Sequence, residues 1–198
     1  MRSNDTVKVN PSTGPRDRLD AEVWMASPPD SEIKVSIHHL VLAEVKGQVA
    51  RWTATIVPDL GDASRSTVEV VVDAGSIQTG VTERDNHMRS AEFLNIARFP
   101  EIHFQSREVR AGDAQRMTIT GDLRIRDVTR PVTLSIERQD VRGDEAGGDD
   151  PRPLFRGHAS IRRGEFGLRW YEESGIDALV AGDVVDIDFT VVPRPVRR

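Results

Sequence analysis

The sequence predicts an all-β domain, a barrel or a sandwich, with one short helical insertion. Most of the chain alternates between apolar and polar residues, a period typical of half-buried strands. A helical period occurs in one stretch, residues 76–106. No strand pattern leads through a long helical pattern into a second strand, as parallel α/β folds require. An antiparallel sheet with one apolar face therefore accounts best for the chain.

Most of the expected strands follow one another with short polar connections; the exceptions include the stretch at 76–106 and an irregular segment at 168–180. Each has apolar residues at every second position and ends near turn-forming residues. They cover residues 19–25, 31–40, 45–57, 66–73, 102–106, 117–125, 132–136, 154–163 and 183–192. The strands at 117–125 and 132–136, joined by a turn at 127–130, predict a hairpin with one dry and one wet face.

Two adjacent histidines lie near the end of the strand expected at 31–40. In a strand, Val35 and Ile37 share a face with His39, whereas His38 lies on the opposite face. The two imidazoles therefore cannot bind one metal ion. His39 is either a core residue that hydrogen-bonds to the backbone or a polar contact inside a cavity.

The strand expected at 45–57 changes phase near Ala50 and Arg51. Val49 belongs to one phase and Trp52 to the other. A β-bulge at this point reconciles the two phases. Because a bulge bends its strand, the same feature favours a barrel, whose strands must bend to close.

The helical part of the stretch at 76–106 carries the basic residues Arg84, His87 and Arg89 beside acidic ones. These three would donate to an oxygen at the polar end of a ligand if they lay near the mouth of a cavity, since arginine offers a forked donor. The alternative is a solvated loop in which Arg84 and its neighbour Asp85 cap the short helix.

An acidic, glycine-rich segment covers residues 139–153. It is typical of a mobile hairpin loop. A calcium-binding loop is the alternative, but the spacing of its acidic residues matches no EF-hand pattern.

Composition sets the bounds of the prediction. The 198 residues suit one domain, with a disordered leader at 1–17 and a basic tail at 194–198. The net charge of −5 argues against nucleic-acid binding. The sequence has no run of about 18 apolar residues, so no transmembrane segment is expected. Without cysteine and without an apolar segment near Met1, the expected location is cytoplasmic.

Six segments, in order along the chain, form a recognisable set: DSEIKVSIHHL, EVKGQVARWTATI, the block SIQT–RDNHM–PEIHF, ITGDLRIRDVTRPVTLSI, IRRGEFGL and AGDVVDIDFTV. Together they resemble the YceI-like family of lipid-binding barrels. The resemblance runs from about residue 30 to residue 192 and places the family histidine at His39. It implies an eight-stranded antiparallel lipocalin-like β-barrel with a short helical insertion, which we expect over residues 18–193.

The resemblance also implies a ligand class and an assembly. Some members of the family bind polyisoprenoid chains, such as isoprenoid quinones or polyprenyl phosphates, in a long apolar cavity, and pairing as a homodimer also occurs. A barrel of this size either fills with side chains or holds one small ligand, and apolar alternation leaves both open. With the resemblance, we expect a cavity and a non-catalytic protein that binds, carries or sequesters such a chain.

The residues expected to contact the ligand are inward-facing apolar side chains together with polar residues near a mouth. They are Val35, Ile37, His39, Val49, Trp52, Arg84, His87, Phe93, Phe104, Ile119, Leu123, Leu134 and Phe155.

Two other classes of function compete with this expectation. As an enzyme, the chain would use residues such as His39, His87, His103, Asp85 or Glu92, whose spacing forms no recognisable nucleophile, base and orienting group. We expect no catalysis, cofactor or metal. The third class is a stress-response or protein-interaction module with no physiological lipid ligand.

Overall fold

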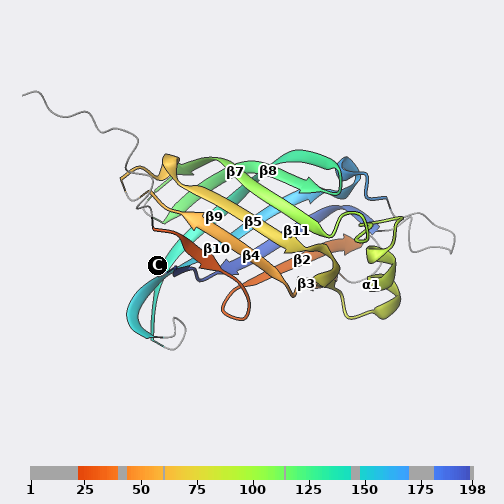
Figure 1. Ribbon diagram of the computed structural model, residues 1–198, viewed down its shortest axis with the longest axis horizontal. Helices are drawn as coiled ribbons and strands as arrows, with labels where there is room; N and C mark the ends of the chain where they lie inside the picture. Colours follow the sequence, from red (N-terminus) through yellow and green to blue (C-terminus); the bar gives the residue numbers. More distant parts are fainter. Residues whose placement is uncertain are drawn as a thin grey trace, which may run out of the picture.

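An antiparallel sheet that curls into a barrel forms most of the structure, a computed structural model that describes residues 22–39, 44–59, 61–113, 115–143, 148–169 and 181–196. The helix α1 (Thr82–Arg89) lies at one end of the barrel (Figure 1). The disordered leader expected at residues 1–17 lies outside the described residues.

Within the described residues, twelve strand segments make up the sheet, and each hydrogen-bonded pair is antiparallel. They are β1 (Trp24–Ala26), β2 (Glu32–His39), β3 (Val45–Val49), β4 (Trp52–Val57), β5 (Thr67–Asp73), β6 (Ile77–Gln78), β7 (Glu101–Ala111), β8 (Arg116–Ile125), β9 (Val128–Gly143), β10 (Gly148–Arg162), β11 (Ala181–Val191) and β12 (Arg194–Pro195). Their order in the sheet is β12-β1-β4-β5-β7-β8-β9-β10-β11-β2-β3-β6.

Four of the strands are each interrupted once. On one side of the interrupted strand β3–β4, β2 pairs with β3 and β1 pairs with β4. On its other side, β6 pairs with β3 and β5 pairs with β4. In turn, β11 and β12 pair with β2 and β1. The twelve segments therefore occupy eight strand positions, and the pairing of β11 with β2 closes the ring. The expected eight-stranded, lipocalin-like barrel with a short helical insertion is confirmed, and so is the irregularity near Ala50 and Arg51.

Two buried serines bridge the interrupted strands. The hydroxyl of Ser76 donates to the carbonyl oxygen of Asp73 at 2.7 Å and accepts from the N–H of Arg51 at 3.0 Å. The hydroxyl of Ser31 accepts from the N–H of Val192 at 2.9 Å. Because buried backbone groups need partners, these hydroxyls replace the ladder bonds that the breaks remove.

We expect Ser76→Ala to lower the free energy of unfolding by about 1–3 kcal/mol, since it leaves buried backbone groups without partners. Urea denaturation at neutral pH measures the change. The control is Ser135→Ala on the exposed face of β9, which should alter stability by less than about 0.5 kcal/mol. Equal stability of both variants and the parent protein would contradict this role of Ser76.

The segment at 139–153 differs from the sequence expectation. It was expected to be a mobile hairpin loop, but β9 continues to Gly143 and β10 begins at Gly148. Its cross-strand pairs include Gln139 with Leu154. The hairpin extends beyond the barrel at the end away from α1 (Figure 1). A hairpin whose register is already set by the barrel can continue with polar residues on both faces. The polar composition of this segment therefore did not predict its strands.

Several strand ends also differ. The strands expected at 102–106 and 132–136 are present, but β7 and β9 extend beyond these bounds at both ends. The expected turn at 127–130 is reduced to Arg126 and Asp127, with Arg126 in the left-handed region at φ 57°. The strand expected at 19–25 appears as β1, and β12 lies within the expected basic tail. Charged residues on the outer face concealed these continuations, because only the inner face needs to be apolar.

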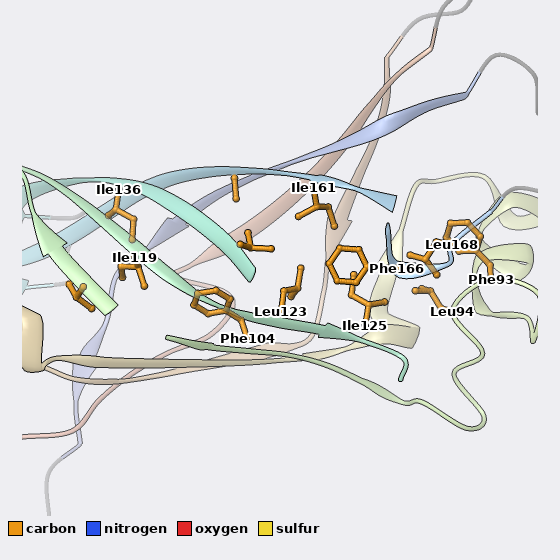
Figure 2. Close-up of a cluster of buried hydrophobic side chains, with 13 residues drawn as sticks. Phe93, Leu94, Phe104, Ile119, Leu123, Ile125, Ile136, Ile161, Phe166 and Leu168 are labelled. Carbon is orange, nitrogen blue, oxygen red and sulfur yellow. The ribbon is translucent and has the colours of Figure 1, made fainter. Parts of the chain in front are cut away.

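The main core cluster is densest at the α1 end of the barrel. There Phe93, Leu94, Ile125, Phe166 and Leu168 come together (Figure 2). They derive from the segment after α1, from β8 and from the residues that follow β10. This end is therefore the most closely packed part of the core, whereas the labelled side chains farther along the barrel are more widely spaced.

Candidate functional site

The barrel encloses an apolar cavity of about 950 Å³. Each of the eight strand positions contributes inward-facing side chains to its wall. The volume lies at the upper end of the range found for small-molecule sites. Along β8 the wall extends from Met117 to Ile125, which corresponds to about 20 Å along the axis of a barrel with tilted strands.

Inward aliphatic side chains in the middle of the barrel remain only partly buried. Val70, Leu134 and Ile187 are of this kind, although all three face the interior. In a close-packed core such residues would be buried almost completely. Their residual exposure is to the cavity, so the barrel is hollow rather than filled.

Two glycines in the wall make room for phenylalanine rings. A Cβ at Gly121 would overlap the ring of Phe104, and a Cβ at Gly157 would overlap the ring of Phe189. Gly157 and Phe189 are cross-strand partners, so the ring lies over the glycine. Each ring thereby occupies space next to the wall, which leaves the centre of the barrel open.

Twelve of the thirteen residues expected from the sequence line this cavity. They are Val35, Ile37, Val49, Trp52, Arg84, His87, Phe93, Phe104, Ile119, Leu123, Leu134 and Phe155. The thirteenth, His39, ends β2 opposite Ala181, and its side chain lies outside the described part of the chain. Whether these residues contact a ligand stays a prediction.

Sequence reasoning did not include several wall residues. Val68, Val70 and Val72 on β5 line the cavity, as do Ile187 and Phe189 on β11. The signal was present in the alternation of both strands. What the sequence did not supply was the phase of each strand relative to the barrel interior.

Arg84 reaches the cavity wall from α1 and is held by Thr79. Its Nε donates to Thr79 Oγ1 at 2.7 Å, and its Nη2 donates to the Thr79 carbonyl at 3.3 Å. Thr79 in turn donates from Oγ1 and from its N–H to Asp85 Oδ1, at 2.6 and 2.9 Å. The buried Asp85 therefore fixes the threonine that positions the arginine. Asp85 does not cap the helix, whose N-cap residue is Val81.

The environment of Asp85 changes its ionisation. Desolvation by burial acts to raise the pKa of the carboxyl, but the two hydrogen bonds from Thr79, with Arg89 and Arg84 nearby, outweigh it and hold the pKa below its usual value of 3.8. Since the folded pKa is lower than the unfolded one, the charged carboxylate stabilises the fold above pH 3.8, and this contribution is lost as pH falls through the folded pKa.

We expect Asp85→Asn to lower the free energy of unfolding by about 1–2 kcal/mol at pH 7, because it removes charge-assisted hydrogen bonds. Below pH 3.8 the difference from the parent protein should shrink, since the parent loses the same charge. Chemical denaturation across a pH series measures both effects. Glu83→Gln, an exposed change in the same helix, is the control. A difference that does not depend on pH would contradict this account.

The other two basic residues of this stretch have different roles. His87 lines the cavity, with its Nδ1 3.9 Å from Glu92 Oε2 and its ring 6.3 Å from that of Phe93. Arg89 does not line it. Instead, Arg89 Nε donates to the carbonyl of Gly75 at 3.0 Å and joins α1 to the barrel wall.

The opposite end of the cavity also carries polar groups. Asp59 and Arg138 line it there. Asp59 pairs with Arg65 at 3.0 Å, and Arg138 pairs with Asp140 at 3.1 Å. The apolar wall thus lies between two polar ends.

A hydrogen-bonded cluster on the outer face of β10 and β11 was absent from the sequence predictions. His158 lies between Asp188, 2.9 Å from its Nδ1, and Ser160, 3.1 Å from its Nε2. The order resembles a hydrolase triad. However, Ser160 also donates to Asp186 at 2.5 Å, and the His158 side chain is 51% exposed on a paired, convex sheet. Because the serine is held by Asp186 and the imidazole is half exposed, this geometry does not favour acyl transfer.

Among the described residues, no three His, Cys, Asp or Glu side chains are grouped as a metal site would require. In the same part of the chain, the helices are too short or too polar to cross a membrane.

Comparison with known proteins identifies the family. Residues 24–192 match the YceI-like domain. Proteins named YceI from Salmonella newport (strain SL254) and Salmonella heidelberg (strain SL476) are each 33% identical to this chain over 136 residues, which is 69% of this chain and 70% of theirs. The chain therefore belongs to the YceI-like family.

Solved structures show the same fold at lower identity. Burkholderia cenocepacia BcnA is 18% identical, with a TM-score of 0.69 over 82% of this chain and 95% of BcnA. A polyisoprenoid-binding domain from Saccharophagus degradans, implicated in plant cell wall breakdown, is 15% identical, with a TM-score of 0.60 over 87% of this chain and 98% of that domain. At these identities the likeness establishes the fold.

Proposed function

We propose that this protein is a non-catalytic carrier or sequestering protein for a long apolar ligand, and that the ligand is a polyisoprenoid such as an isoprenoid quinone or a polyprenyl phosphate. The observation that carries the proposal is the hollow barrel of about 950 Å³, with its partly buried aliphatic wall. Family membership and the polyisoprenoid-binding domain of the same fold support the ligand class.

The driving force would be burial of the ligand chain. At roughly 25 cal/mol per Å², removing about 400 Å² of apolar ligand surface from water contributes on the order of 10 kcal/mol. Loss of translational and conformational freedom offsets part of this gain. A flexible chain therefore needs most of the cavity length to bind well, which favours long ligands over short ones.

Native mass spectrometry of protein purified without detergent tests the proposal. We expect a bound long-chain compound, or one-to-one uptake of added geranylgeraniol. A spectrum of ligand-free protein that takes up neither geranylgeraniol nor geranylgeranyl phosphate would contradict the proposal and favour an interaction module. The cytoplasmic location and the homodimer expected from the sequence remain predictions.

A further inference from the structure

The wall of the barrel is incomplete between β9 and β10 at the α1 end. The ladder between these strands ends at the pair Ser135–His158. Beyond it, residues 128–134 of β9 remain paired with β8, and residues 159–162 of β10 remain paired with β11. Over these described residues the two strands are not paired with each other. Pro131, which has no N–H to donate, lies within the part of β9 that is not paired with β10.

A second pocket, of about 330 Å³, lies at this gap. Residues of both strands line it, together with the turn that follows β10. Val132 and Ile161 line both this outer pocket and the main cavity. The two hollows therefore share part of a wall, and the buried ring of Phe166 lines the outer pocket beside it.

Phe166 is held by a short turn rather than by a strand. It belongs to the 3₁₀ turn η4 (Arg163–Phe166), which ends at Gly167 with φ 71°. A glycine in this conformation adopts alternative backbone angles at low cost. Beside Val132 and Ile161, which line both hollows, the outer pocket is thus bounded by one aromatic ring next to a glycine.

Arginine side chains flank the outer pocket on both sides of the gap. Arg130 of β9 and Arg162 of β10 line it, and both are exposed. The acidic groups nearby are Glu165 in the same pocket, Asp183, 3.6 Å from Arg162, and Asp186, which accepts a hydrogen bond from the pocket residue Ser160. Because an exposed ion pair at this distance is weak, Arg162 remains able to bind an anion. The two guanidinium groups offer forked donors suited to phosphate oxygens.

From these observations we infer that the gap between β9 and β10 is a side opening of the cavity, in which Arg130 and Arg162 bind the phosphate of a lipid whose chain lies in the barrel. The inference rests on the proposed function and narrows it, because it selects a phosphorylated chain over a neutral one. Phe166 would turn aside to let the chain pass between the strands.

Binding of two matched compounds, geranylgeranyl phosphate and geranylgeraniol, tests the inference. We expect the parent protein to bind the phosphate at least about tenfold more tightly at low salt, with the difference decreasing as salt is added. Arg130→Gln/Arg162→Gln should remove this preference and leave the affinity for the alcohol unchanged. The control, Arg110→Gln/Arg116→Gln, changes two exposed arginines on β7 and β8 and should keep the preference.

Each contrary outcome is distinct. Equal affinity for both compounds in the parent protein, or a preference that persists in Arg130→Gln/Arg162→Gln, overturns the inference and leaves the proposed function standing. Inorganic phosphate that competes as well as the phosphorylated chain would show a site for free phosphate, separate from the cavity, and would also overturn it. If neither compound binds, the proposed function fails together with the inference.

Discussion

Tryptophan at positions 70 and 134 should weaken binding of a long-chain ligand by about 100-fold or more, a loss of roughly 3 kcal/mol or greater. Val70 on β5 and Leu134 on β9 face the cavity from strands three positions apart around the barrel. Because both side chains border empty space rather than a packed core, the larger rings can enter it with little overpacking strain. The double variant Val70→Trp/Leu134→Trp should therefore fold normally and exclude the chain.

The matched controls are the neighbouring residues on the same strands. Glu69→Trp and Thr133→Trp add the same rings on the exposed face of β5 and β9. Titration with geranylgeraniol measures affinity, and thermal unfolding measures stability. A double variant that is as stable as the parent protein and still binds with full affinity would show that the cavity is not the binding site.

The second large effect is expected at Gly121, where alanine should destabilise the fold by about 3 kcal/mol. A Cβ at this position would meet the backbone carbonyl of Gln105 as well as the ring of Phe104. Gly121 lies opposite Ser106, next to the irregular register between β7 and β8. A ring can rotate, but the carbonyl cannot move without disturbing the ladder, so the cost lies at the upper end for overpacking.

Gly157→Ala is the control for that effect. There the nearest atoms to an added Cβ all belong to the ring of Phe189. The ring can swing into the cavity, so we expect a stability loss of about 1 kcal/mol and weaker ligand binding. Urea denaturation of both variants decides the comparison. The account fails if Gly157→Ala is as destabilised as Gly121→Ala.

The inner face of the barrel was largely predictable because apolar alternation reflects burial directly. The change of phase between Val49 and Trp52 indicated the irregular strand, and both residues line the cavity. The hollow interior was not predictable from the residues alone, since alternation is the same in a filled barrel. It depends on pairings such as that of Gly157 with Phe189, which join residues 32 positions apart in the chain.

Other features depend on tertiary context. Phe166 follows the end of the strand expected at 154–163, yet it is almost completely buried because η4 places it beside the gap between β9 and β10. The cluster around His158 is built from two strands with about 30 residues between them, and no local pattern indicates it. The long β9–β10 hairpin was missed because its residues are polar on both faces.

The pairing of β1 with β12 brings distant parts of the chain together: the N–H of Val196 donates to the carbonyl of Val23 at 2.7 Å. A short linker could join these two positions without spanning the barrel. A circularly permuted chain, joined there and reopened in the turn between β7 and β8, would retain every strand pairing of the ring. The barrel could then be inserted into a host protein through its new ends between β7 and β8, which lie away from α1 (Figure 1).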